Sequence, residues 1–117
     1  MYSMPIPDNN SVSESAALPS ADALGEHAAS AAELLKALAN PHRLQVLCVL
    51  GEGELSVGEL NSRIPLSQSA LSQHLAVLRA DDLVRTRRES QTIFYRIAAG
   101  PALDLIRVLH DHFCKAD

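Results

Sequence analysis

The chain has 117 residues, enough for one small domain with a single core. Aromatic residues make up only 3% and tryptophan is absent, so the core must be built from leucine, isoleucine, valine and alanine. The formal net charge of −4 argues against general affinity for nucleic acid, and no apolar run approaches the roughly 18 residues of a membrane span.

Residues 1–20 are rich in serine and contain Pro5, Pro7 and Pro19, without apolar periodicity. This composition predicts a disordered tail, because such a segment has too little apolar surface to fold. The segment also lacks the basic start and apolar stretch of a secretory signal, so we expect a cytoplasmic protein. Residues 21–117 are then the folded domain.

Two helices are predicted after the tail. Residues 21–38 are rich in alanine and place Ala28, Ala31, Leu35 and Leu38 at helical spacing. A second helix begins at Asn40-Pro41, where asparagine caps and proline opens the first turn. It runs to about Leu50, because glycines follow it.

The next segment predicts a helix-turn-helix. Ser56 and Glu59 have the spacing of a capping box and begin a short helix. Pro65 and Leu66 end it, and Ser67 can cap the following helix.

The helix after Ser67 has two distinct faces. Leu71, Leu75 and Leu78 form a buried stripe. The other side carries short or amide side chains that can reach base edges in a major groove: Gln68, Ser69, Ser72 and Gln73. An ordinary amphipathic surface helix shows the same pattern, so the neighbouring segments must decide between the two interpretations.

A β-hairpin is predicted downstream. The run Val84–Arg88 forms its first arm, and in its second arm Ile93, Tyr95 and Ile97 occupy every second position, which is the period of a strand. Its first arm carries three arginines, Arg85, Arg87 and Arg88. Residues 63–96 contain six arginines and three acidic residues, a local charge of +3 that the total hides. These arginines are either solvated surface charge or DNA contacts, and their position beside a recognition helix favours contacts with phosphates.

A last helix begins at Pro101. One apolar stripe runs along it, formed by Ala102, Leu105, Ile106, Leu109 and Phe113. A short chain has few elements to cover this stripe and that of residues 21–38, so both helices predict a dimer interface.

The chain resembles the ArsR/SmtB family of winged helix-turn-helix repressors over about residues 21–114. The residues that carry the resemblance are Leu35-Lys-Ala-Leu-Ala-Asn-Pro-His-Arg-Leu44, Leu55-Ser-Val-Gly-Glu-Leu60, the run Ser67–Arg79, Leu83-Val84 and Phe94-Tyr95-Arg96. The resemblance implies a mainly α fold of five helices with a two-stranded antiparallel wing. It also implies a homodimer, paired through its first and last helices, that binds an inverted repeat in a double-stranded DNA operator.

Metal sensing is the weaker of two switching hypotheses. Many metal-sensing relatives have a cysteine where this chain has Ser56, and a hydroxyl is a poor ligand for a soft metal. The end of the last helix carries several possible ligands: His110, Asp111, His112 and Cys114. His110 and His112 are two positions apart, so a helix directs them about 200° apart and they cannot share one metal shell. We therefore predict no metal site and no cofactor, with a site completed by a partner chain as the alternative.

The two cysteines carry the stronger hypothesis. Cys48 lies among leucines and valines, where a small hydrophobic residue also fits. A dithiol branch of the family, which includes the BigR, SqrR and HlyU regulators, places one cysteine in the second helix and one in the last. The resemblance therefore implies that Cys48 and Cys114 form a redox dithiol, oxidised by reactive sulfur species or peroxide. Arg43, Arg107 or Lys115 could lower a thiol pKa.

No glycine-rich phosphate loop, catalytic carboxylate pair or activated nucleophile is apparent, so we expect no enzyme. His74, at the edge of the buried stripe, is expected to be structural. A redox-switched repressor leads, a metal-switched repressor is the alternative, and a protein-interaction module on a winged helix is a third possibility.

Overall fold

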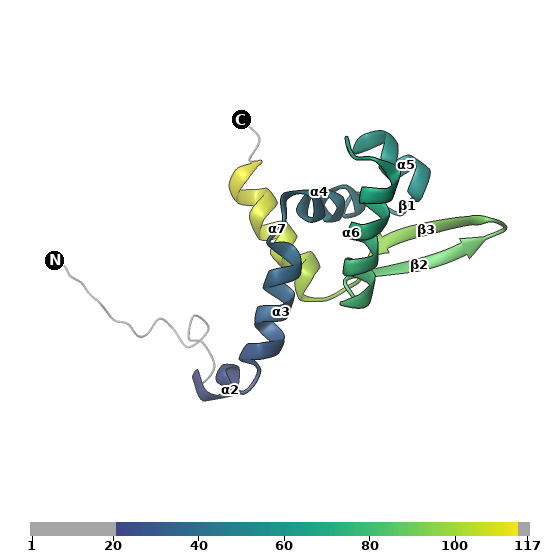
Figure 1. The fold of residues 1–117 in the computed structure, drawn as a ribbon. Coiled ribbons are helices and arrows are strands. Elements are labelled where there is room, and N and C mark those ends of the chain that lie inside the picture. The colour runs from purple at the N-terminus through teal and green to yellow at the C-terminus, as the bar shows by residue number, and fades with distance from the viewer. Residues whose placement is uncertain (1–20, 115–117) are drawn as a thin grey trace. The chain divides into compact units, whose positions relative to one another are not determined.

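The computed structural model describes residues 21–114, which fall into two units, residues 21–32 and residues 33–114 (Figure 1). The tail predicted over residues 1–20 and Lys115 lie outside the described residues. The two units are described separately below.

Helices α2 (Ala21–Gly25) and the start of α3 (Ala28–Leu38) form the first unit. The single helical stretch predicted over residues 21–38 is interrupted after Gly25. Glycine is among the weakest helix formers, and the chain turns here with the His27 N–H donating to the Leu24 carbonyl at 2.9 Å.

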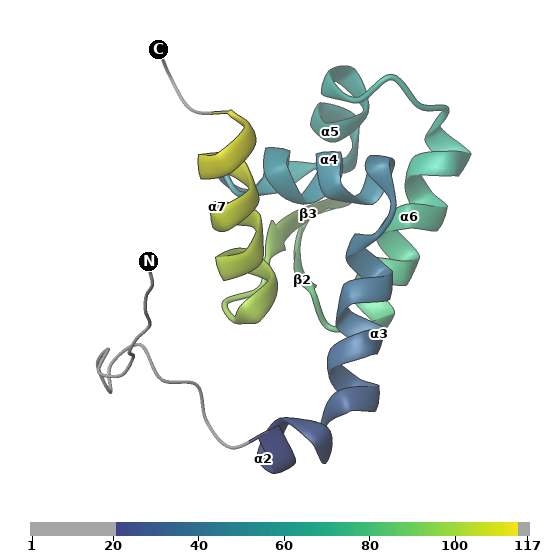
Figure 2. The same ribbon diagram turned by 90° about the vertical axis from the view of Figure 1, so that its left-hand side faces the viewer.

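Helix α4 (Pro41–Leu50) has the bounds that the sequence predicts. It lies at the centre of the second unit. The Asn40 side chain caps it and accepts from the N–H groups of His42 and Arg43, both at 3.0 Å. Figure 2 shows α4 between α6 and α7, and it packs against both. Val46, Leu47 and Leu50 are almost completely buried there.

The predicted helix-turn-helix is formed by α5 (Val57–Arg63) and α6 (Gln68–Ala80). The capping box is present, with Ser56 N–H donating to Glu59 at 2.8 Å and Glu59 N–H donating to the Ser56 hydroxyl at 3.1 Å. The Ser67 hydroxyl accepts from Ala70 N–H at 3.1 Å and starts α6. Both caps agree with the sequence prediction.

The sheet has one strand more than the predicted hairpin. Strands β2 (Val84–Glu89) and β3 (Thr92–Ile97) form the antiparallel wing, and β1 (Leu55–Ser56) pairs with the other edge of β3. The tight turn is Ser90-Gln91, because Glu89 still pairs with Thr92. A strand of two residues has no periodicity that sequence analysis could detect.

Helix α7 (Pro101–Phe113) closes the described chain and buries Ala102 and Ile106 against the core. Val108 and Phe113 on the same helix are 62% and 75% exposed. The predicted mainly helical, winged helix-turn-helix fold is thus confirmed. Within residues 21–114, no helix is long and apolar enough to cross a lipid bilayer.

Candidate DNA-reading face and cysteine pocket

The exposed side of α6 carries the four predicted base-reading residues. Leu71, Leu75 and Leu78 are buried against the core, and the exposed residues of the helix include Gln68, Ser69, Ser72 and Gln73. A shallow hollow of about 380 Å³ lies between the start of α6 and the tip of the wing. Gln68 and Ser72 line it from α6, Thr92 and Ile93 line it from the wing, and Val57 and Gly58 line it from the start of α5.

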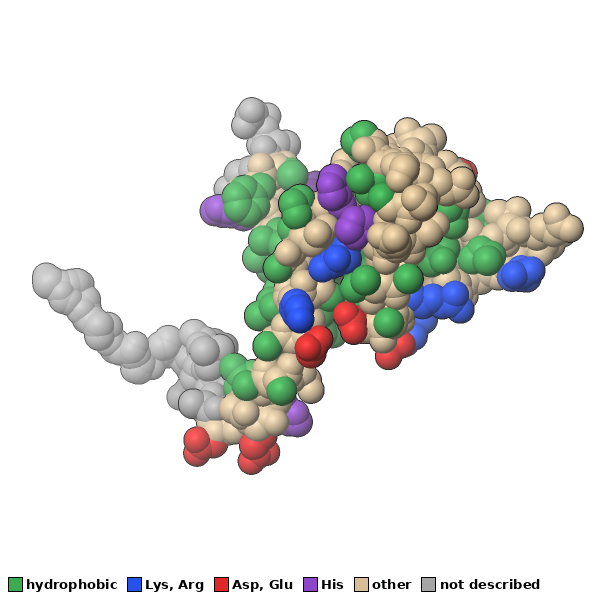
Figure 3. Space-filling model, in the orientation of Figure 1, with side chains coloured by type: hydrophobic (Ala, Val, Ile, Leu, Met, Phe, Trp, Pro, Cys, Tyr) green, Lys and Arg blue, Asp and Glu red, His purple; other side chains and the backbone are tan. Residues whose placement is uncertain are grey.

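The wing arginines are divided between the two faces of the sheet. Side chains alternate along a strand, and the register pairs Arg85 with Arg96 and Arg88 with Ile93. Arg85 and Arg87 therefore share one face, and Arg88 lies on the other. Figure 3 shows Lys and Arg side chains gathered along the wing, as the local charge predicts.

Arg87 is held by neighbouring groups. Its guanidinium donates to Glu54 at 2.7 Å and to Glu89 at 3.2 Å, and it lies 4.6 Å from the centre of the Phe94 ring. The Arg87 guanidinium lowers the pKa of the Glu54 carboxyl, and Glu54 with Glu89 raises the pKa of Arg87. Arg85 has a looser partner in Asp82 at 3.6 Å, while among the described residues Arg88 has no acidic partner. Contact between Arg87 and DNA stays a prediction, and its geometry favours a role in holding the wing.

The loop after α4 is tied by ion pairs to α5 and to the wing. Glu52 accepts from Arg63 at the end of α5 at 2.9 Å, and Glu54 binds Arg87 on the wing. Hydrogen bonds from Arg63 lower the pKa of the Glu52 carboxyl. A change at the end of α4 therefore has direct polar connections to α5 and to β2.

Cys48 lies on α4 and Cys114 directly follows α7, which packs against α4, although 66 positions separate the two cysteines in the numbering. Cys48 is half-buried on α4, and Cys114 is exposed directly after α7. Both are free thiols. The charge of Cys114 is one of the causes that raise the pKa of the Cys48 thiol, after burial.

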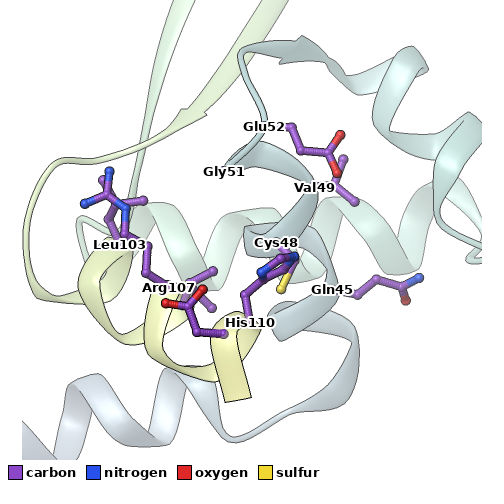
Figure 4. Close-up of a pocket in the computed structure, with 10 residues that line it drawn as sticks. Gln45, Cys48, Val49, Gly51, Glu52, Leu103, Arg107 and His110 are labelled. Atoms are coloured by element: carbon purple, nitrogen blue, oxygen red, sulfur yellow. The ribbon is translucent and has the colours of Figure 1, made fainter. Parts of the chain in front are cut away.

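A pocket of about 310 Å³ lies between α4 and α7 (Figure 4). Cys48 and Glu52 line it from α4 and its loop, and Arg107, His110 and Asp111 line it from α7. In Figure 4 the His110 side chain extends from α7 toward Cys48. The pocket gives a small solute access to a partly buried thiol.

Burial raises the pKa of the Cys48 thiol, and the charges of Cys114 and Glu52 raise it further. The suggestion that neighbouring cations lower this pKa is therefore wrong for Cys48. Arg43 is directed elsewhere, since its Nε donates to the Ala37 carbonyl at 2.6 Å. The raised pKa favours the neutral thiol of Cys48, and a thiol must ionise before it acts as a nucleophile.

His110 is a pocket residue, although the sequence presents it only among the candidate metal ligands of the last helix. It lies four positions before Cys114, and the Cys114 N–H donates to the His110 carbonyl at 2.8 Å. Residues spaced by four lie on one side of a helix, so this spacing could have linked His110 to the thiols. His112 is placed differently, since its ring packs edge-on against Phe113 at 4.6 Å.

His74 lies at the edge of the buried stripe, as expected. Its ring centre is 5.6 Å from that of His42 on α4. Burial lowers its pKa, and the charges of Arg43 and His42 lower it further. These contacts favour a structural role in joining α4 to α6. Within residues 21–114, no three His, Cys, Asp or Glu side chains are arranged to hold a metal ion.

The sequence matches known regulators over most of its length. Residues 40–86 match the family described as bacterial regulatory protein, arsR family. The chain is 55% identical over 92 residues to the transcriptional activator HlyU of Vibrio cholerae, covering 79% of this chain and 85% of that protein. The chain belongs to the ArsR family. It is therefore a winged helix-turn-helix transcription regulator, as the resemblance implied.

Two further similarities support this membership. The biofilm growth-associated repressor of Agrobacterium fabrum is 48% identical over 95 residues, which is 81% of either chain. The solved structure of reduced HlyU from Vibrio cholerae superposes with a TM-score of 0.76 at 53% identity, covering 80% of this chain and 99% of that one. These relatives include one named as an activator and one named as a repressor.

Proposed function

We propose that this ArsR-family chain is a homodimeric repressor that binds an inverted-repeat operator and leaves it when Cys48 and Cys114 become linked. Reactive sulfur species are the first candidate oxidants, and peroxide is the second. The observation that carries the proposal is that Cys48 lines the pocket between α4 and α7, and that Cys114 directly follows α7, one helical turn after the pocket residue His110.

The DNA-binding part of the proposal rests on α6 and the wing. Gln68, Ser69, Ser72 and Gln73 are exposed on one helix and provide the donors and acceptors that read base edges. Arg85 and Arg88, with Arg87 if it exchanges its carboxylate partners, then contact phosphates.

The homodimer is supported by apolar surface on α7. Val108 and Phe113 are exposed, and Figure 3 shows hydrophobic side chains on the surface over this helix. Leu35 on α3 is also 55% exposed. Exposed apolar side chains on terminal helices favour burial against a second copy.

The linking step balances when a persulfide R–S–SH is the oxidant. The Cys48 thiolate attacks the outer sulfur, so that Cys48–S–SH forms and R–SH leaves. The Cys114 thiolate then attacks the Cys48 sulfur, which forms Cys48–S–S–Cys114 and releases hydrogen sulfide. The two thiols are oxidised, the persulfide is reduced, and the two thiol protons leave with the products.

The link would act on DNA binding through α4. A bond between the cysteines joins the end of α7 to α4, and α4 packs against α6. The loop after α4 also holds α5 and the wing through Glu52 and Glu54. A small displacement of α4 therefore moves the surfaces that must match a fixed operator.

A binding titration tests this function. We expect the reduced protein to bind its operator, to lose affinity after treatment with glutathione persulfide, and to recover with dithiothreitol. Cys48→Ser and Cys114→Ser should bind DNA and ignore the persulfide. Release by zinc from both serine variants would support the metal-switched alternative, and full affinity of the linked protein would contradict the switch.

A further inference from the structure

We propose that His110 is the base that takes the proton from the Cys48 thiol when a persulfide enters the α4–α7 pocket, an inference that rests on the proposed sulfur-sensing function. Cys48 would then be the first thiol to react and Cys114 the second. His110 has no place in the DNA-binding surface described above.

The geometry brings a base, a thiol and an open volume together. His110 and Cys48 line the same pocket of about 310 Å³ from opposite helices, and in Figure 4 the His110 side chain extends toward Cys48. Among the groups that line this pocket, imidazole is the one whose unperturbed pKa suits proton transfer near neutral pH. Cys114 lies one helical turn beyond His110, so the second thiol is near the same reaction site.

The charges around Cys48 create the need for a base. Burial disfavours the Cys48 thiolate, and the charges of Cys114 and Glu52 disfavour it further, so the pKa of Cys48 is raised. The protonated form of His110 lowers the pKa of the Glu52 carboxyl, so an imidazolium at this position lies near a carboxylate that favours it. When His110 takes the thiol proton, the new imidazolium lies near both the thiolate and Glu52. Arg107 and Asp111 complete the charged lining on α7.

The step is balanced without a further reagent. The Cys48 proton moves to the imidazole, and the thiolate attacks the outer sulfur of R–S–SH. The S–S bond of the persulfide breaks, Cys48–S–SH forms, and the departing R–S⁻ takes the proton from His110. The imidazole is neutral again at the end.

The test measures how fast Cys48 reacts, without DNA. In a Cys114→Ser background, glutathione persulfide is added from pH 6 to pH 10 and the added sulfur is followed by quenched-flow mass spectrometry. At pH 7, His110→Gln should react roughly 10- to 100-fold more slowly. The two rates should converge at high pH, where Cys48 ionises without help. A structural role would lower the rate by the same factor at every pH.

His112→Gln is the matched control, because it removes a histidine from the same helix that packs on Phe113 and lies outside the pocket lining. It should react as fast as the parent. Equal rates for His110→Gln and the parent at pH 7, or a factor that does not change with pH, would overturn the role of His110. The proposed function fails separately if a His110-containing protein becomes linked and still holds its operator. A Cys48 that does not react at any pH overturns both.

Discussion

Arg87 on the wing and Glu54 in the loop after α4 form an ion pair with a shortest N–O distance of 2.7 Å. The guanidinium donates to both carboxylate oxygens through Nε and Nη2. Cys48 lies six positions before Glu54 in the numbering, so this pair connects the wing to the segment that carries the proposed sensor.

Glu54→Gln should weaken operator binding by loosening the wing, without removing any predicted DNA contact. Exposed ion pairs contribute little, so we expect a loss of roughly two- to fivefold in affinity. Glu89→Gln is the matched control, because Glu89 binds Arg87 at the longer distance of 3.2 Å. Fluorescence anisotropy with labelled operator measures both variants. Equal affinities for Glu54→Gln and the parent would show that the pair does not position the wing.

Mutations of the proposed base-reading residues and of the proposed phosphate-contacting residues should affect DNA affinity in different ways. Gln73→Ala or Ser69→Ala should cost about 1–3 kcal/mol of binding free energy and relax the preferred sequence. Arg88→Ala should weaken all sequences alike and reduce the salt slope by about one. Titrations against operator and scrambled DNA at several salt concentrations distinguish the two effects, with Lys36→Ala on α3 as the control. Unchanged affinity in both kinds of variant would contradict the proposed interface.

The Cys48 thiol should titrate above the ordinary cysteine pKa of about 8.5. Burial and the charges of Cys114 and Glu52 raise the pKa of Cys48, so the neutral thiol is favoured in the folded state. This contribution to stability is present below the unfolded pKa and is lost as the pH rises through the folded one. Ultraviolet absorbance of the thiolate in Cys114→Ser gives the midpoint.

Glu52→Gln should move that midpoint downward, because a neighbouring negative charge is removed. Glu54→Gln changes a carboxylate in the same loop that does not act on Cys48, and it should leave the midpoint in place. An upward shift in Glu52→Gln would contradict the assigned cause.

Replacing exposed apolar residues on α7 should prevent assembly. Val108→Glu combined with Phe113→Glu places two charges on the proposed dimer surface, and both parent side chains are largely exposed in one chain. Sedimentation at micromolar concentration should find a dimer for the parent and a monomer for the double variant, which should also lose operator binding. A monomeric parent with full specific affinity would contradict the dimer.

The sequence predicts the DNA-facing helices well, because their signals are local. Leu71, Leu75 and Leu78 repeat at helical spacing, and the caps at Ser56 and Ser67 are each followed by the expected partners. The strand alternation around Tyr95 predicts the wing for the same reason. Each of these signals lies within a few residues.

The remaining features depend on contacts between distant segments. The Arg87–Glu54 pair joins residues 33 positions apart, so the sequence shows three wing arginines without showing that one is already held. The raised pKa of Cys48 depends on burial and on Cys114, which only the packing of α4 on α7 brings near. The place of His110 in the pocket likewise depends on the packing of α7 against α4, which brings it to the same cavity as Cys48.

Native mass spectrometry of the operator complex during persulfide addition tests the central claim most directly. It reports the link between Cys48 and Cys114 and the bound DNA in the same ion. We predict that operator-bound dimers carry free thiols. DNA-free dimers should appear at the same rate as the intramolecular link forms. Linked dimers that remain on the operator would contradict the account.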